Sequence, residues 1–193
     1  AFDRAGNLDL ATAKQQFQWL LDCGCHGMAV GGSTGEGHTL SRDEFTQLVE
    51  VAVNEVGSAI PVIAGIIVNS TQEAIERGKL AKAVGADALQ VTPVHYLFRP
   101  DDDSMVLHVR MLAEQTELHV IIYNVVPWTY LSPDLLCRIM KEVPGVVGVK
   151  QSAGDMKLLA DLLQQCQPED LIFSAVDALL YPSFQLGAQG AIA

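Results

Sequence analysis

The stretch Pro144-Gly145-Val146-Val147-Gly148-Val149-Lys150-Gln151-Ser152 decides how the rest of the sequence is interpreted. Its apolar run predicts a short strand buried on both faces, which is typical of a parallel sheet covered by helices. Lys150 ends this run, and lysine is rarely buried because desolvating its charge is costly. Burial lowers the pKa of a lysine, and a neutral amine can attack a carbonyl carbon to form a Schiff base. The simpler alternative is a lysine whose ammonium reaches past the strand end into water.

Length and composition limit the fold and the partners. The chain has 193 residues, of which 49% are hydrophobic, so one domain with a sizeable core is expected. A net charge of -11 argues against nucleic acid or an anionic membrane as a partner, because either would require a basic surface. The four cysteines form no C-x-x-C pair and no zinc-ligand spacing, which favours reduced cysteines in a cytoplasmic protein without a metal site.

Helices and strands are expected to alternate along the whole chain. The expected helices cover residues 9–23, 41–56, 70–84, 102–116, 133–143, 155–167 and 178–186. The expected strands cover residues 27–31, 61–67, 88–92, 120–123, the run ending at Lys150, 171–174 and 190–193. Ser41 with Glu44, and Ser70 with Glu73, predict two capping boxes. The acidic run 101–103 is interpreted as helix capping rather than as a metal site.

Seven helix-then-strand units predict parallel strands joined by right-handed crossovers. An open doubly wound sheet and a (β/α)8 TIM barrel both fit this α/β alternation. The barrel is favoured because no nucleotide-binding glycine fingerprint follows the early strands and because polar residues end several different strands. A closed barrel needs one more strand before Ala1 and one more helix after Ala193. We therefore expect a single incomplete TIM-barrel domain over residues 1–193, lacking the first strand and the last helix, with exposed edge strands.

Polar side chains follow several of the predicted strands, at Ser33 and Thr34, Thr92, Tyr123 and Lys150. In a parallel barrel these strand ends meet at one mouth. Tyr123 and Lys150 would end neighbouring strands, where a phenol can move the protons that imine formation requires. The hydroxyls and N–H groups around Ser33 and Thr34 could hold a carboxylate. Taken alone, Tyr123 is more often a core tyrosine, and the glycine-rich loop more often an ordinary tight turn.

Together, three short motifs resemble the dihydrodipicolinate synthase and N-acetylneuraminate lyase family of Schiff-base aldolases: Gly32-Ser33-Thr34-Gly35-Glu36, Tyr123-Asn124 and Gly148-Val149-Lys150. The resemblance covers essentially the whole chain and implies a (β/α)8 barrel with additional C-terminal helices. It implies that Lys150 forms an imine with pyruvate or a related 2-oxo acid, without a cofactor, and that Tyr123 is the general acid and base. Ser33 and Thr34 would bind the substrate carboxylate and connect Tyr123 to a hydroxyl relay. Glu36 would hold the loop, and Ile192 would line the site.

Three departures from the family pattern concern the second substrate. Family synthases have Thr-Pro-Tyr-Tyr after the fourth strand, with the second tyrosine entering a neighbouring subunit's relay, whereas this chain has Thr92-Pro93-Val94-His95-Tyr96. Trp128 stands where the synthases have an arginine for the carboxylate of the second substrate, and an indole cannot clamp a carboxylate. The family's Gly-Asp-Asp is Ala175-Val176-Asp177 here. His95, Tyr96 and Trp128 are therefore candidate contacts for a different second substrate.

The leading hypothesis is a Schiff-base-forming lyase, of aldolase or synthase type, acting on pyruvate or a related 2-oxo acid. A dehydratase of 2-keto-3-deoxy sugar acids remains an alternative, because the same lysine and tyrosine serve both reactions. A truncated barrel without catalytic activity is a further alternative of a different class. The resemblance also implies a homo-oligomer, a dimer or tetramer if the protein is full length, with subunit contacts through the loop at residues 93–100.

Overall fold

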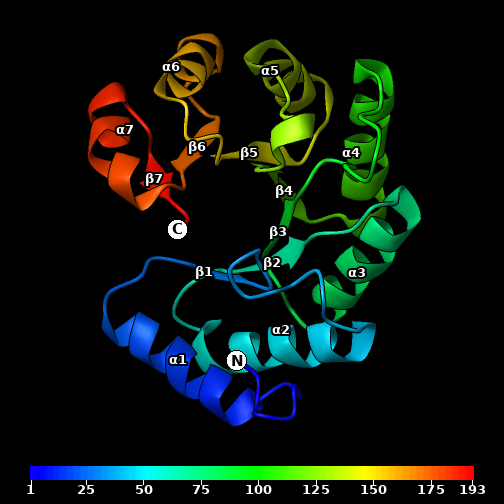
Figure 1. Ribbon diagram of the computed structural model, residues 1–193, viewed down its shortest axis with the longest axis vertical. Helices are drawn as coiled ribbons and strands as arrows, with labels where there is room; N and C mark the ends of the chain where they lie inside the picture. Colours follow the sequence, from blue (N-terminus) through cyan, green and yellow to red (C-terminus); the bar gives the residue numbers. More distant parts are fainter.

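The computed structural model describes residues 1–193 and contains one parallel sheet of seven strands. The strands follow one another in chain order: β1 (Met28–Val30), β2 (Val62–Ile66), β3 (Ala88–Val91), β4 (His119–Asn124), β5 (Val146–Gln151), β6 (Leu171–Ser174) and β7 (Gly190–Ala191). The sheet curls around a central axis (Figure 1). β1 pairs only with β2 and β7 only with β6, so the sheet is an open barrel rather than a doubly wound sheet.

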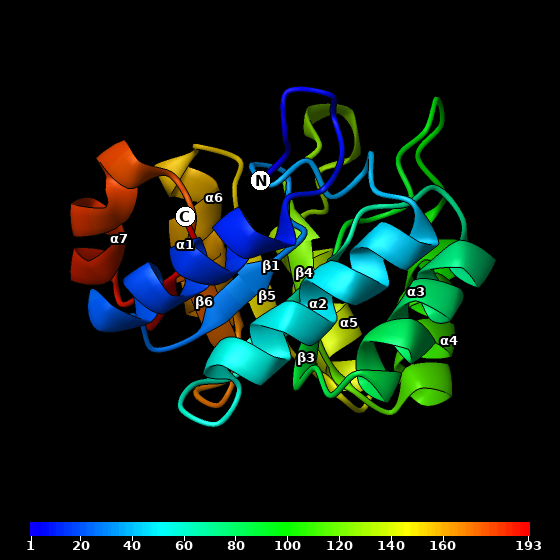
Figure 2. The same cartoon turned by 90° about the horizontal axis from the view of Figure 1, so that it is seen from below.

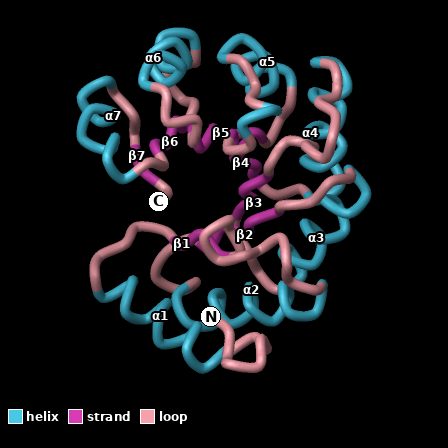
Figure 3. Tube along the Cα trace, viewed as in Figure 1, coloured by secondary structure: helices cyan, strands magenta, loops and turns pink.

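The helices form an outer layer around the curled sheet (Figure 3). They are α1 (Leu10–Asp22), α2 (Arg42–Val56), α3 (Thr71–Ala83), α4 (Asp102–Thr116), α5 (Pro133–Glu142), α6 (Met156–Gln165) and α7 (Leu180–Leu186). Two short 3-10 helices, η1 (Pro127–Thr129) and η2 (Asp177–Leu179), follow β4 and β6. The predicted alternation of helices and strands is confirmed. None of these helices has both the length and the apolar character needed to cross a membrane.

The boundaries of most elements lie within two residues of the predicted ones. Two differences lie near the C-terminal end, where the predicted helix at 178–186 begins as the 3-10 helix η2 and the predicted strand at 190–193 has only two paired residues. Gly187 ends α7 with a φ of +108°, a left-handed conformation that favours glycine.

Helix capping explains three of the helix starts. The predicted capping box of Ser41 and Glu44 is present at α2. The second predicted box is only half formed, because Ser70 accepts a hydrogen bond from the Glu73 N–H, whereas the Glu73 carboxylate lies 3.6 Å from Arg77 Nε. Asp101 caps α4 by accepting a hydrogen bond from the Ser104 N–H, in agreement with the capping interpretation of the acidic run.

The two faces of the sheet have different roles. Alternate residues of the strands pack outward against the helices and form the hydrophobic core, among them Val62, Ala64, Ile66, Leu89, Val91, Ile122, Val149 and Ile172. The intervening residues, which include Tyr123 and Lys150, face the inside of the curl because side chains alternate along a strand. Loops that follow β1, β3 and β4 lie on one side of the molecule (Figure 2). The fold therefore brings the predicted polar strand ends to a common mouth.

Candidate active site

Lys150 lies near the end of β5 with its side chain almost completely buried; only 7% of the residue is exposed. Burial desolvates the ammonium and lowers the pKa of Lys150 from 10.5 to about 8. Tyr123 on β4 is the register partner of Lys150, and the Lys150 Nζ atom lies 4.1 Å from the centre of its ring. The alternative of a lysine extending into water is therefore wrong. The side chain instead places an amine of unusually low basicity against a phenol.

The ends of β4 and β5 are joined by a buried amide network. Asn124 donates through Nδ2 to the Leu131 carbonyl (3.1 Å) and to Gln151 Oε1 (3.3 Å), and its Oδ1 accepts from the Leu131 N–H (2.9 Å). Asn124 and Gln151 directly follow Tyr123 and Lys150 and are themselves register partners. The network thus fixes the position of the two strand ends that carry the phenol and the amine.

The loop after β1 presents free hydrogen-bond donors. The N–H groups of Ser33, Thr34 and Gly35 and the hydroxyls of Ser33 and Thr34 donate to no protein acceptor, whereas the Gly37 N–H closes the loop onto the Gly32 carbonyl at 3.0 Å. Successive free N–H groups form a site suited to an anion. The loop also lies very close to β2, because a Cβ on Gly65 would be only 2.4 Å from the Gly31 carbonyl oxygen.

The far end of the same loop is held by Arg77 of α3. Its guanidinium is buried and donates to the carbonyls of Leu40 (2.9 Å) and Gly37 (3.4 Å), and its charge lies 5.4 Å from the ring centre of Phe45. Since these carbonyls accept no other hydrogen bond, Arg77 is the residue that ties the loop to the helical layer. Arg77 therefore fixes the end of the loop that also contains Ser33 and Thr34.

We expect Arg77→Ala to lower the free energy of unfolding by about 3 kcal/mol, because it leaves two buried carbonyls unpaired. Urea unfolding measures the change. Arg42→Ala is the matched control, since Arg42 forms only a partly exposed ion pair with Glu76 and should contribute less than about 1 kcal/mol. Equal effects of the two substitutions would contradict the role given to Arg77.

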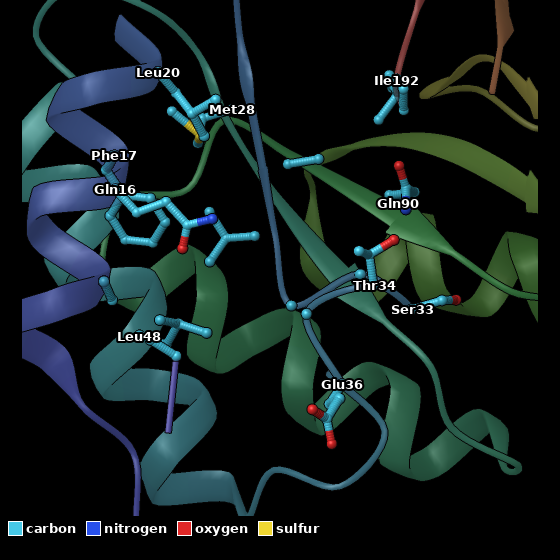
Figure 4. A pocket seen from close by; sticks show the side chains of 18 of the residues that line it. Gln16, Phe17, Leu20, Met28, Ser33, Thr34, Glu36, Leu48, Gln90 and Ile192 are labelled. Carbon is cyan, nitrogen blue, oxygen red and sulfur yellow. The ribbon is translucent and has the colours of Figure 1, made fainter. Parts of the chain in front are cut away.

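A cavity of about 560 Å³ lies beside Lys150 and the loop after β1. Ser33, Thr34, Lys150 and Ile192 all border it, as the sequence predicted for a common site, whereas Tyr123 does not border it and joins the site through its contact with Lys150. Gln90 from β3 borders it as well. In Figure 4, Ser33, Thr34, Gln90 and Ile192 gather in one part of the cavity, whereas Phe17, Met28 and Leu48 form an apolar part. The cavity thus combines a polar region next to the amine with an apolar wall.

Three of the predicted substrate contacts lie elsewhere. His95, Tyr96 and Trp128 do not border the cavity. The Trp128 Nε1–H donates to the His95 carbonyl at 2.8 Å, so η1 supports the loop at 93–100, and Trp128 and Tyr96 are largely exposed. A role of this loop in subunit contacts stays a prediction.

Two expectations concern hydrogen bonds of the loop after β1, and one of them is not met in this structure. No hydrogen bond joins Ser33 or Thr34 to Tyr123, so a hydroxyl relay is not formed among these groups. Glu36 holds the loop through its backbone rather than through its exposed carboxylate, which makes no hydrogen bond. Its N–H donates to the Ser33 carbonyl, and its carbonyl accepts from the Thr39 hydroxyl and N–H, in a left-handed conformation with a φ of 55°.

Comparisons with known proteins agree with this geometry. A family model described as the dihydrodipicolinate synthetase family matches residues 1–193. The chain belongs to this family. It is 34% identical to the 4-hydroxy-tetrahydrodipicolinate synthase of Bacillus subtilis over 194 residues, and 40% identical to that of Ralstonia nicotianae over 190 residues. These alignments cover 99% and 97% of this chain.

Solved structures of the dihydrodipicolinate synthetase family have the same fold as this chain. The chloride-inhibited dihydrodipicolinate synthase of Acinetobacter baumannii, complexed with pyruvate, superimposes with a TM-score of 0.94 at 33% identity. The synthase of Aquifex aeolicus gives a TM-score of 0.93 at 29% identity. Each match covers 100% of this chain and 66% of the other chain. The chain likewise spans 66% of the Bacillus subtilis relative and 64% of the Ralstonia nicotianae relative.

Sequence reasoning missed Gln90 and Arg77. The carboxamide of Gln90 inside the apolar run 88–91 could have marked it as a candidate site residue, because a buried strand rarely carries an amide without a partner. Arg77 gave no such signal, since a basic residue on an amphipathic helix is usually exposed.

Proposed function

We propose that this chain carries the Schiff-base site of a lyase, of aldolase or synthase type, that acts on pyruvate or a related 2-oxo acid. The observation that supports this proposal most directly is the buried Lys150 amine, which has a pKa of about 8 and packs against the Tyr123 ring. The names of the relatives, and the pyruvate complex of the Acinetobacter baumannii synthase, agree with this substrate class.

In the proposed reaction, the neutral Lys150 Nζ attacks the keto carbon of the 2-oxo acid and forms a carbinolamine. The nitrogen then loses a proton, the former keto oxygen leaves as water after protonation, and an iminium remains. Tyr123 carries a hydroxyl and is the register partner of Lys150 on the neighbouring strand, so we assign it the proton transfers to and from the carbinolamine. The iminium accepts electrons when a bond at the adjacent carbon forms or breaks.

The free donors of the loop after β1 suit the substrate carboxylate. The chain carries a net charge of -11, so an anionic substrate needs local donors to enter the site. The N–H groups and hydroxyls at Ser33 and Thr34 supply them on the border of the same cavity as Lys150. We therefore assign carboxylate binding to Ser33 and Thr34, and the wall beside the substrate to Ile192.

We further propose that the second substrate is less charged than that of the family synthases. Trp128 supplies no cation, and its indole N–H is already used by the His95 carbonyl. His95 in turn lies with its Nδ1 3.0 Å from the Pro93 carbonyl. These contacts leave no guanidinium at the position that the family resemblance assigns to the second carboxylate.

Trapping of the imine tests the proposed function. The protein is incubated with pyruvate, the mixture is reduced with borohydride, and the intact mass is measured. We expect one reduced pyruvate on the chain, attached at Lys150 after peptide mapping. Absence of any adduct on a chain that unfolds cooperatively would overturn the proposal.

The pH dependence of imine formation follows from the lowered pKa. With a pKa of about 8, about a tenth of Lys150 is neutral at neutral pH, compared with less than about one in a thousand for an ordinary lysine. The initial rate of adduct formation should therefore rise about tenfold for each pH unit up to about pH 8 and then level off. Samples incubated between about pH 6 and about pH 10, then reduced in a common buffer, give the profile. A rate that still rises steeply near pH 10 would show an unperturbed lysine.

A further inference from the structure

Gln90 is the one fully buried carboxamide of the barrel whose two polar ends are both unpaired. Its residue exposure is 0%, and neither Nε2 nor Oε1 has a hydrogen-bond partner. An unpaired buried amide destabilises a fold, so native proteins rarely keep one without a reason. The other buried glutamine, Gln151, uses its Oε1 to accept hydrogen bonds from Asn124 and Ala153. This fold therefore pairs one end of the Gln151 amide, whose Nε2 is also unpaired, and leaves both ends of the Gln90 amide open.

The register of the sheet places Gln90 one layer below the reactive pair. Gln90 pairs with Ile121, and Ile121 pairs with Gly148, so these residues lie two positions before Tyr123 and Lys150 on their strands. Gly65 on β2 is the other register partner of Gln90. The Gln90 side chain borders the cavity that Lys150 and the loop after β1 share.

Gln90 also faces the loop assigned to the carboxylate. A methyl group placed on Gly32 would lie 3.8 Å from Gln90 Nε2, so the amide lies directly beneath the start of this loop. Figure 4 shows Gln90 next to Thr34, with Ile192 on the opposite side. Because both ends of the amide are unpaired, the group can turn over without losing a hydrogen bond. Its NH₂ group can therefore be directed at a ligand held by the loop.

We propose that Gln90 is a substrate-binding residue, which donates an amide hydrogen bond from the floor of the cavity to the carboxylate of the 2-oxo acid. This inference rests on the proposed function and adds a third donor to those of Ser33 and Thr34. An amide suits the position better than a lysine or arginine. A second cation near Lys150 would compete with the Lys150 amine for the substrate carboxylate, and unlike an amide it could not accept a hydrogen bond. Binding of the ligand then supplies the partner that the free protein lacks.

The test compares Gln90→Leu with the parent protein in two measurements. The first is the pyruvate concentration that gives half-maximal reduced adduct, and the second is the thermal midpoint with and without pyruvate. Loss of a hydrogen bond to a charged group should raise the half-saturating concentration about 10- to 100-fold. The ligand-free thermal midpoint should stay the same or rise, because an unpaired buried amide is removed. Gln90→Glu should raise the half-saturating concentration further, since its charge repels the carboxylate.

Gln15→Leu is the matched control, because Gln15 is exposed on α1 and does not border the cavity. An unchanged half-saturating concentration in Gln90→Leu would overturn the role of Gln90 and leave the proposed function intact. The role of Gln90 would likewise be overturned if the half-saturating concentration of Gln90→Leu rises only together with a loss of its ligand-free thermal stability. A parent protein that forms no adduct but is stabilised by pyruvate would overturn the imine reaction, and the thermal shift would still test Gln90. A parent with neither response would overturn both proposals.

Discussion

Lys150→Ala is expected to abolish the pyruvate adduct completely, because no other lysine borders the cavity. The substitution removes the nitrogen that becomes the imine, so the effect is loss of the product rather than a slower rate. Lys150→Arg should have the same effect, since a guanidinium stays protonated and cannot act as the nucleophile. Intact-mass analysis after reduction with borohydride gives the result directly.

Lys157→Ala is the matched control for Lys150→Ala. Lys157 lies on α6 with a largely exposed side chain, paired with Asp161, and its substitution should leave the adduct unchanged. An adduct that persists in Lys150→Ala and maps to another lysine would contradict the assignment of the nucleophile. An adduct lost in both variants would indicate non-specific modification of surface amines.

The same lysine is expected to lower the stability of the fold at neutral pH. Its pKa in the folded state is about 8, below the usual 10.5, so the unfolded chain binds more protons between these values and stability rises with pH across this window. Below about pH 8 the full cost of the buried charge is present. Lys150→Met should therefore be at least as stable as the parent in urea at neutral pH, although it forms no adduct. Such a result would separate loss of chemistry from loss of folding.

Tyr123→Phe is expected to slow the initial rate of adduct formation by about 10²- to 10⁴-fold, the usual contribution of a general acid or base. The phenylalanine ring keeps the contact of the Tyr123 ring with Lys150 Nζ, so the nucleophile and its burial remain. Adduct should consequently still accumulate at long incubation times. Time courses of adduct formation at a fixed pyruvate concentration give the rate, and the pH at which the rate levels off should match that of the parent.

Tyr181→Phe provides the control for Tyr123→Phe, because Tyr181 is exposed on α7. It should form adduct at the parental rate. A parental rate in Tyr123→Phe would show that water or another group carries out the proton transfers. A Tyr123→Phe protein whose rate levels off at a different pH would instead indicate that the hydroxyl acts by changing the pKa of Lys150.

Lys150 and Gln90 share a physical property that connects stability with function. Both are buried polar side chains on the inner face of the sheet, and neither forms a hydrogen bond within the protein. A sheet that carried apolar residues at both positions would be more stable and would present no group to a 2-oxo acid. Buried polar groups on the inner face of the curled sheet therefore lower the stability of the fold, which is common for ligand sites.

The sequence by itself determined the elements and their order. Alternating apolar runs and capping residues such as Ser41 and Asp101 specify helices and strands through local hydrogen bonds and burial, which act over a few residues. The position of Lys150 at the end of an apolar strand was also clear from the sequence, whereas its burial was one of two alternatives that the structure decided. The three short motifs carried the resemblance to the family, and the ends of parallel strands were expected to meet at one mouth.

Only the tertiary structure decided which of these residues meet. Arg77 reaches carbonyls 37 and 40 residues earlier, and Asn124 connects to Gln151 across 27 residues, contacts that depend on helix and strand packing rather than on local spacing. The inward direction of Gln90 follows from the register of β3 between β2 and β4. His95, Tyr96 and Trp128 do not border the cavity, and the Trp128 N–H binds the His95 carbonyl, a contact between residues 33 positions apart. Short-range patterns thus fix the strands, whereas strand register and long-range hydrogen bonds fix which side chains share the site.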